Sequence, residues 1–271
     1  MIAENKAVPI TIKSPLRYPG GKYRAVDTVA AYIPPTITEL VSPFFGGGSI
    51  ELYLASKGVQ VYGYDVFEPL VEFWQYLLLD APALGKEVEK YYPLKNKYHF
   101  YELKEAQRKL PTPLERATVF YVLNRCSFSG STLSGGMSPK HPRFTRRVIQ
   151  KLKRFYNPHI QVQLADFKES LSSHPDTFAY LDPPYLVKVP LYGRNGNAHR
   201  FFDHLELAAL LKGRQQWLLS YNDCPEIREL YKDYHIIAPE WKYGMTSSRK
   251  SNEVLIFSPD LNPINYVESK K

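Results

Sequence analysis

Short apolar segments alternate with amphipathic ones along this chain of 271 residues. Residues 38–42 form an apolar run, and residues 59–64 alternate between apolar and polar positions, as a half-buried strand does. Between them, residues 49–57 carry apolar side chains at helical spacing, with Ser49 suited to cap the helix and Gly58 suited to end it. This order of strand, helix and strand predicts a βαβ unit.

A similar alternation returns in the second half of the chain. Strands alternating with helices form a mostly parallel sheet that is covered on both faces, so the pattern predicts an α/β fold. The strands are expected at 160–164, 178–181, 217–221 and 253–257, and the helices at 205–211 and 224–231.

The middle of the chain interrupts this alternation with a pattern that is mainly helical. We take residues 85–160 as an inserted, largely helical subdomain, and residues 1–84 and 161–271 as the main domain. The boundaries rest on the change of hydrophobic period.

The positive charge of the protein is concentrated in this insert. The whole chain carries 35 Lys and Arg against 27 Asp and Glu, whereas residues 86–160 alone hold 16 basic and 5 acidic residues. Because solvated helix faces normally mix the two signs, this excess predicts a polyanionic partner, whose condensed counterions are released on binding. Between residues 140 and 154, seven cations follow one another without an acid: Lys140, Arg143, Arg146, Arg147, Lys151, Lys153 and Arg154.

Other features of the composition narrow the class of protein. The two cysteines, Cys126 and Cys224, lie far apart, which suits a reducing cytoplasm and predicts neither a disulfide framework nor a zinc site. We expect no secretory signal and no membrane span, because no apolar run is long enough. The seven histidines have no paired spacing, so no metal is expected.

The sequence Asp182-Pro183-Pro184-Tyr185 directly follows an apolar strand, where α/β sheets bind their ligands. Two prolines can simply end a strand, but the acid and the aromatic ring add chemistry. The exocyclic amine of a nucleobase is a poor nucleophile because its lone pair is delocalised into the ring. A carboxylate and a backbone carbonyl that accept its two hydrogens favour a pyramidal nitrogen, and the tyrosine can stack on a base taken out of the helix.

A glycine-rich turn at 44–48 precedes a second candidate site residue, Asp65. The turn alone indicates only close packing. An acid 17 positions after Gly48, at the end of the next strand, can accept both hydroxyls of a ribose, as in dinucleotide-binding folds. The spacing allows NAD as well, although the loop lacks G-x-G-x-x-G because Ile50 and Glu51 fill the later positions.

The segment Tyr18-Pro19-Gly20-Gly21-Lys22 invites comparison with a phosphate-binding loop. That assignment fails, because Leu16 stands where such a loop needs glycine and Tyr23 replaces the Ser or Thr that would hold magnesium. Taken by itself, the segment is equally consistent with a plain turn.

Taken together, these residues resemble the Dam-type (D12 class) group of DNA adenine methyltransferases, from about residue 16 to residue 257. The resemblance implies an S-adenosylmethionine-dependent methyltransferase fold, Rossmann-like, with an inserted target-recognition subdomain. It places catalysis at Asp182, Pro183, Pro184 and Tyr185. It implies that S-adenosyl-L-methionine is bound by Tyr18, Lys22, Phe44, Gly46, Gly48, Asp65, Asp166 and Asp182, with Asp65 and Asp166 contacting its ribose and adenine.

The basic insert falls where this family has its DNA reader, and Asn124-Arg125 resembles the start of the family's DNA-contacting hairpin. Arg125 or Arg143 is suited to read a guanine through two hydrogen bonds. Residues 188–200 are expected to form a mobile lid over the site. Residues 126–129 depart from that hairpin, so no GATC target is implied. The expected DNA contacts are Asn124, Arg125, Ser127, Lys140, Arg143, Arg146, Arg147, Lys151 and Arg154.

The expected reaction is methyl transfer from S-adenosylmethionine to adenine N6 in double-stranded DNA, with the base flipped out, in a modification or restriction-modification setting. A cognate restriction endonuclease is a possible partner. Cytosine N4 methylation has the same amine chemistry and stays open, as do an RNA substrate and a non-catalytic DNA-binding role on the same fold. A nicotinamide oxidoreductase fits least, for lack of its glycine pattern.

Overall fold

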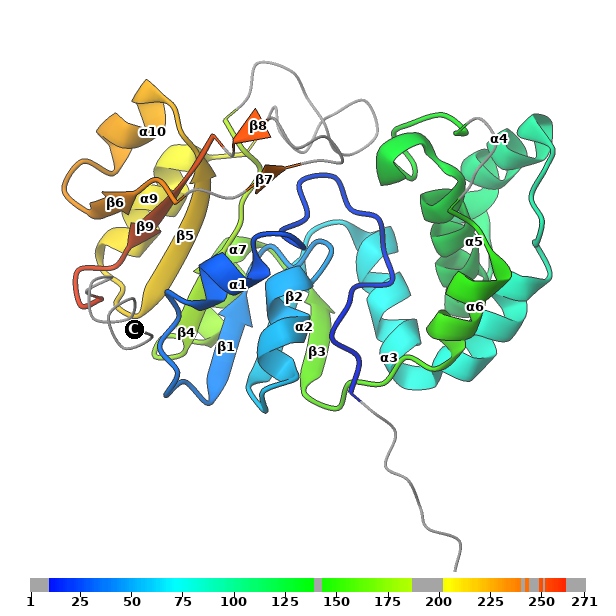
Figure 1. Cartoon of the computed structure of the whole chain (residues 1–271), viewed down its shortest axis with the longest axis horizontal. Helices are drawn as coiled ribbons and strands as arrows, with labels where there is room; N and C mark the ends of the chain where they lie inside the picture. Colours follow the sequence, from blue (N-terminus) through cyan, green and yellow to red (C-terminus); the bar gives the residue numbers. More distant parts are fainter. Residues whose placement is uncertain are drawn as a thin grey trace, which may run out of the picture.

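The computed structural model describes residues 10–138, 143–186, 202–239, 242–243, 249–250 and 252–261. Its centre is a seven-stranded sheet in the order β3-β2-β1-β4-β5-β9-β6 (Figure 1). Six of the seven strands run in one direction and β9 runs opposite to them, so the predicted α/β class with a mostly parallel sheet is confirmed. The strands are β1 (Glu39–Ser42), β2 (Gln60–Asp65), β3 (Ile160–Leu164), β4 (Phe178–Leu181), β5 (Trp217–Asn222), β6 (His235–Ile237) and β9 (Glu253–Phe257).

Helices cover both faces of this sheet, and successive strand residues point alternately into two buried clusters. Leu40 packs with the first face and Val41 with the second. The first face carries α1 (Val26–Ala30), α2 (Ser49–Ala55) and α3 (Glu68–Glu89), and the second carries α7 (Phe167–Ser173), α9 (His204–Lys212) and α10 (Pro225–Leu230).

The predicted strands at 160–164, 178–181 and 253–257 are β3, β4 and β9 with the same bounds. The sequence pattern did not indicate β6, α1 or α7, nor the small hairpin of β7 (Lys242–Tyr243) and β8 (Arg249–Lys250). These elements have seven residues or fewer, which is too short for a periodic signal to stand out.

The direction of strand addition reverses between β1 and β4, which are parallel neighbours. In an open α/β sheet, ligands bind outside the carboxyl ends of the strands at such a reversal. The carboxyl ends of β1, β2 and β4 therefore meet at one edge of the sheet, where the glycine-rich turn, Asp65 and Asp182 lie.

The insert lies beside α3, on the β3 side of the sheet (Figure 1). Helix α3 bends at Asp80 (φ −152°, ψ 77°) just before Pro82, which lacks a backbone N–H. The predicted boundary at 84/85 thus falls inside α3, and the inner faces of α5 and α6 belong to the buried cluster of the first sheet face. The elements of the insert are α4 (Lys97–Ala106), η1 (Gln107–Lys109), α5 (Pro113–Cys126), η2 (Phe128–Gly130) and α6 (Arg146–Lys153).

Two successive residues of α3 connect the insert to the main sheet. Phe73 stacks on Tyr121 of α5, with ring centroids 5.6 Å apart and an interplanar angle of 6°. Trp74 meets Phe45 of the glycine-rich turn edge-on at 5.1 Å. One turn of helix therefore contacts both the insert and the loop that follows β1.

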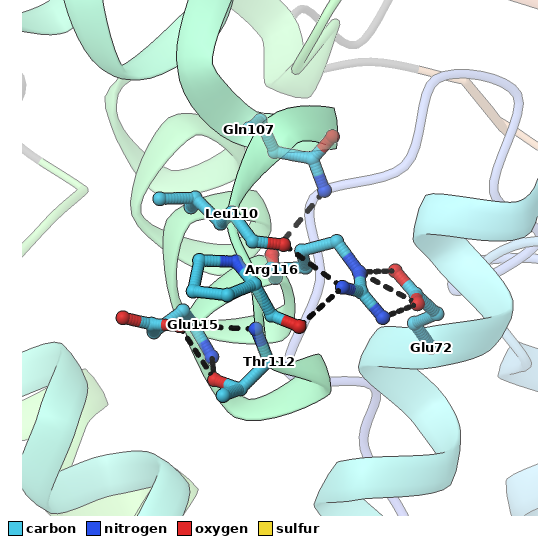
Figure 2. A network of polar contacts seen from close by, with 7 residues as sticks. Glu72, Gln107, Leu110, Thr112, Glu115 and Arg116 are labelled. Atoms are coloured by element: carbon cyan, nitrogen blue, oxygen red, sulfur yellow. Dashed lines mark hydrogen bonds and ion pairs between the residues drawn. The ribbon is translucent and has the colours of Figure 1, made fainter.

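A polar network fixes the start of α5 against α3 (Figure 2). Thr112 caps α5 in a reciprocal capping box with Glu115, and proline occupies the first turn, as helix N-termini favour. The guanidinium of Arg116 donates to both carboxylate oxygens of Glu72 at 2.5–2.9 Å and to the carbonyl of Leu110 at 2.9 Å. The bidentate pair holds two helices in register.

Arg116→Met should destabilise the protein, because it leaves the Glu72 carboxylate, only 17% exposed, without its partner. We expect the free energy of unfolding to fall by about 1–3 kcal/mol in urea titrations. The matched control is Lys232→Met, which breaks the exposed Lys232–Glu229 pair and should change stability by less than about 0.5 kcal/mol. Equal losses in the two variants would contradict a special role for the α3–α5 pair.

Candidate active site

A cavity of about 520 Å³ lies where the segments after β1, β2 and β4 meet, a size typical of small-molecule sites. Its walls contain every residue predicted to act in catalysis or in cofactor binding, from Tyr18 to Tyr185. Residues of the loop at 130–134 also line it, so the insert contributes to the same cavity.

The glycine-rich turn is shaped by two left-handed residues. Gly46 has φ +48°, and a Cβ there would lie 3.0 Å from the ring of Tyr18. Gly48 has φ +64° and is the N-cap of α2, so Ser49 is the first helical residue and the expectation that it caps the helix was wrong. The indole of Trp74 donates to the carbonyl of Gly46 at 3.0 Å, which holds the turn against α3.

Asp65 ends β2 and is fixed by two backbone donors. The amide of Gly46 donates to Oδ2 at 3.0 Å, and the amide of Phe67 donates to Oδ1 at 2.9 Å. Burial raises the pKa of Asp65 to about 6, against the lowering by these hydrogen bonds. The two oxygens offer about four lone-pair sites, so the carboxylate keeps acceptor capacity beyond its backbone hydrogen bonds from Gly46, Phe67 and Val66.

Lys22 lies at the centre of the site and is only 3% exposed. Its ammonium donates to Asp182 Oδ1 at 2.7 Å and Oδ2 at 2.8 Å, and to the hydroxyl of Tyr185 at 2.6 Å. Glu253, on β9, lies 3.5 Å from the same ammonium. A buried cation needs partners of opposite charge. The Lys22 ammonium thereby joins the Tyr18–Lys22 segment to the Asp182 motif and to β9.

Glu51 is a second buried carboxyl in the cavity wall, with 3% of its surface exposed. It stands in the first turn of α2 and accepts a hydrogen bond from the hydroxyl of Ser42 at 2.7 Å. Burial raises its pKa to about 7, and the nearby charge of Asp182 adds to the increase, while Ser42 and Lys22 oppose it.

Aromatic rings close another side of the cavity. Phe44 stacks on Phe167 with centroids 6.0 Å apart and meets Phe202 edge-on at 5.5 Å. Beside them, Asp166 caps α7, where its Oδ1 accepts from the amides of Lys168 and Glu169 at 2.9 Å each. A flat apolar wall next to a carboxylate suits a purine ring.

Asn124 and Ser127 do not face solvent, contrary to their expected contact with DNA. Both are 0% exposed. The Asn124 side chain accepts from the amide of Arg17 at 2.9 Å and donates to its carbonyl at 2.8 Å, and Ser127 accepts from the amide of Thr132 at 2.9 Å. Their polar groups are used to hold the loop that lines the cavity, so we correct the expectation for these two residues.

Arg125 is also engaged within the protein. Its guanidinium donates to the carbonyl of Arg143 at 2.7–3.0 Å and to that of Pro15 at 3.3 Å. We therefore assign Arg125 to holding the loop as well. Lys140 and the expected lid at 188–200 lie outside the described residues. The remaining expected DNA contacts are exposed: Arg143, Arg146, Arg147, Lys151 and Arg154.

Sequence reasoning missed several residues of the site, chiefly Ser42, Glu51, Trp74 and Glu253. An acid in the first turn of a helix is common, so Glu51 gave no signal that it is buried. Glu253 did give one, because it opens a strand that is otherwise apolar. The part of the chain that the structure describes holds no group of three metal-ligating side chains and no helix able to cross a membrane.

Comparison with known proteins decides the family. The model of the D12 class N6 adenine-specific DNA methyltransferases matches residues 18–245. The chain belongs to this family. Methylation of adenine in DNA is its activity, and the resemblance and the reaction predicted from sequence are confirmed.

Curated relatives of this methyltransferase agree with that assignment. The DNA adenine methylase of Vibrio cholerae is 26% identical over 91% of this chain and 96% of its own length. The DNA adenine methylase of Haemophilus influenzae is 24% identical, over 80% of this chain and 82% of its own. The modification methylase StsI of Streptococcus sanguinis is 25% identical over 68% of this chain, which covers 31% of that protein.

The raised pKa of Glu51 has a consequence for stability. Because its folded-state pKa, about 7, exceeds its ordinary value of 4.5, the ionised carboxylate destabilises the ligand-free fold. Glu51→Gln should therefore raise the free energy of unfolding by about 1–3 kcal/mol above about pH 7. The gain should shrink as the pH falls toward about 4.5, because the Glu51 carboxyl then becomes protonated in both the folded and the unfolded wild type.

Urea titrations of the methyltransferase across this pH range measure the effect. The control is Glu102→Gln, at an exposed position of α4, which should show no such pH-dependent gain. A gain for Glu51→Gln that is independent of pH would contradict the assignment of the raised pKa to this carboxyl.

Proposed function

We propose that the cavity binds S-adenosylmethionine together with an adenine flipped out of double-stranded DNA, and that Asp182 positions the N6 amine for methylation. The observation that carries this proposal is the Asp182 carboxylate, held by buried Lys22 in the same cavity that Asp65 and Asp166 line. A base amine and an adenosine-containing cofactor need acceptors of this kind side by side.

The donor set fits the cofactor. Asp65 has acceptor capacity for the two ribose hydroxyls, and the Phe44–Phe167 wall beside Asp166 suits its adenine. The buried carboxylates of the cavity suit a cofactor whose methionine part carries a sulfonium and an ammonium. When bound, S-adenosylmethionine supplies an electrophilic methyl group.

Asp182 acts on the amine through hydrogen bonding. Lys22 takes one lone pair from each carboxylate oxygen and fixes the plane of the group, which leaves further lone pairs for an N6 hydrogen. The backbone carbonyl of Pro183, whose direction is restricted by the two proline rings, can accept the second hydrogen. With both hydrogens held out of the ring plane, the nitrogen lone pair is freed for attack, and the carboxylate stabilises the positive charge that develops on nitrogen.

Tyr185 provides a stacking surface whose position is fixed at its hydroxyl. That hydroxyl accepts from Lys22, and the ring packs against Tyr221 with centroids 6.0 Å apart. Holding base and methyl group at attack distance accounts for much of the expected rate gain, because it removes translational freedom before the reaction. The methylated amine then loses one proton to water and regains its planar form.

Helix α6 is the part of the insert best suited to DNA. Thr145 caps it, and Ile149 and Leu152 bury one face, so the cations lie on the other. Arg146 and Arg147 stand in its first turn, where the helix dipole disfavours cations by about 0.3–1 kcal/mol each. Their presence despite that penalty favours binding of phosphates. A modification setting is supported by the name of the related modification methylase StsI.

Asp182→Ala tests the catalytic proposal. We expect methylation of unmethylated genomic DNA by labelled S-adenosylmethionine to fall by at least about a hundredfold, because the amine loses its acceptor. Digestion to nucleosides should place the wild-type label in N6-methyl-deoxyadenosine. The control Asp233→Ala removes an exposed acid and should keep full activity. Label in N4-methylcytosine, or unchanged activity of the Asp182 variant, would overturn the proposal.

Replacement of Arg147 and Lys151 by alanine tests the DNA surface. Each lost phosphate contact should reduce the slope of log affinity against log salt by about 1, and the binding of DNA should weaken for all sequences alike. Titrations of labelled duplex at several salt concentrations measure this. Lys212→Ala, at the end of α9, is the control and should leave the slope unchanged. An unchanged slope in the double variant would place the DNA elsewhere.

A further inference from the structure

Glu51 is a buried acid that the proposed reaction does not use. It lines the cavity from the first turn of α2, immediately after the glycine-rich turn. Within the described residues, Ser42 is the only other side chain that hydrogen-bonds to it, through one oxygen. A glutamine would accept that hydrogen bond equally well and would avoid burying a charge. The local structure therefore does not require a charged side chain at this position.

The surroundings of Glu51 leave its charge poorly compensated. Lys22 is the cation that acts on it, but that ammonium is bound to both oxygens of Asp182 and lies 3.5 Å from Glu253. The ammonium that acts on Glu51 is therefore already bound by another carboxylate, on the segment after β4. A ligand that brings a positive charge with N–H donors would complete the cluster.

We propose that Glu51 binds the α-ammonium group of the methionine part of S-adenosylmethionine. The inference rests on the proposed function, which puts this cofactor in the cavity. Of the two cationic groups of the cofactor, only the ammonium has N–H donors, so it alone can form a hydrogen-bonded ion pair with a carboxylate. The turn at Gly46–Gly48 lines the cavity directly beside Glu51, so a ligand whose amino-acid end lies against this turn comes within reach of the carboxylate.

Cofactor binding should then release a proton. In the free protein the pKa of Glu51 is about 7, so near that pH the group is about half protonated. An ammonium beside it favours the ionised form and lowers its pKa. The groups that face Glu51 are Ser42, Lys22 and Asp182.

The experiment compares two cofactor analogues by calorimetry in buffers of different ionisation enthalpy. S-adenosylhomocysteine keeps the amino-acid end, and 5′-methylthioadenosine lacks it but keeps the ribose, so any proton released by Asp65 is common to both. At about pH 7, S-adenosylhomocysteine should release roughly half a proton more than methylthioadenosine. In Glu51→Gln that difference should vanish.

Affinities give a second measurement. Above about pH 8, Glu51→Gln should bind S-adenosylhomocysteine about tenfold more weakly than the wild type, and the two should converge below about pH 5.5. Methylthioadenosine should bind both proteins equally. The difference in proton release between the two analogues is measured on the wild type alone, so it tests the inference even if Glu51→Gln folds poorly.

The outcomes separate this inference from the proposed function. If both analogues bind the wild type with equal proton release, or if Glu51→Gln binds S-adenosylhomocysteine unchanged at every pH, the role of Glu51 is overturned and the cofactor site stands. If neither analogue binds the wild type, the cofactor assignment of the cavity falls, and the role of Glu51 falls with it.

Discussion

The ammonium of Lys22 is the interaction on which the arrangement of the site depends. A charge that is 3% exposed needs partners, and it finds them on segments that are far apart in sequence: Asp182 and Tyr185 after β4, and Glu253 on β9. The orientation of the Asp182 carboxylate, the tilt of the Tyr185 ring and the docking of the Tyr18–Lys22 segment over the sheet edge all follow from one buried cation. The carboxyl ends of parallel strands bring these partners within its reach.

The sequence predicted the sheet well where apolar runs end on an acid or a turn, as at β3, β4 and β9, because such runs have one consistent interpretation. It also indicated the catalytic and cofactor-binding residues that surround the cavity, since motifs at strand ends converge in this fold. It could not reveal the buried state of Glu51, because burial there is decided by tertiary packing rather than by the local pattern.

The segment after α5 shows the opposite limit of sequence reasoning. A stretch rich in serine and glycine within a basic region suggests a loop that contacts nucleic acid, yet Ser127 and Asn124, in the last turn of α5, are fully buried. Their side chains satisfy backbone groups of Arg17 and Thr132, as polar residues in tight loops often do. Composition alone does not distinguish a polar group that binds a partner from one that holds its own loop. The exposed cations of α6, in contrast, follow the sequence pattern directly, because the apolar positions Ile149 and Leu152 fix which face is buried.

Helix α3 also limits how the target preference of such an enzyme can diverge. Its neighbouring residues Phe73 and Trp74 contact the insert and the turn after β1, so the inner aromatic face of α5 is tied to the geometry of the cavity that this turn lines. The exposed cations of α6 are not part of these contacts. Under the proposed DNA contact, evolution can exchange such outward-facing residues for new target sequences, whereas a replacement of the whole insert must keep an aromatic partner for Phe73.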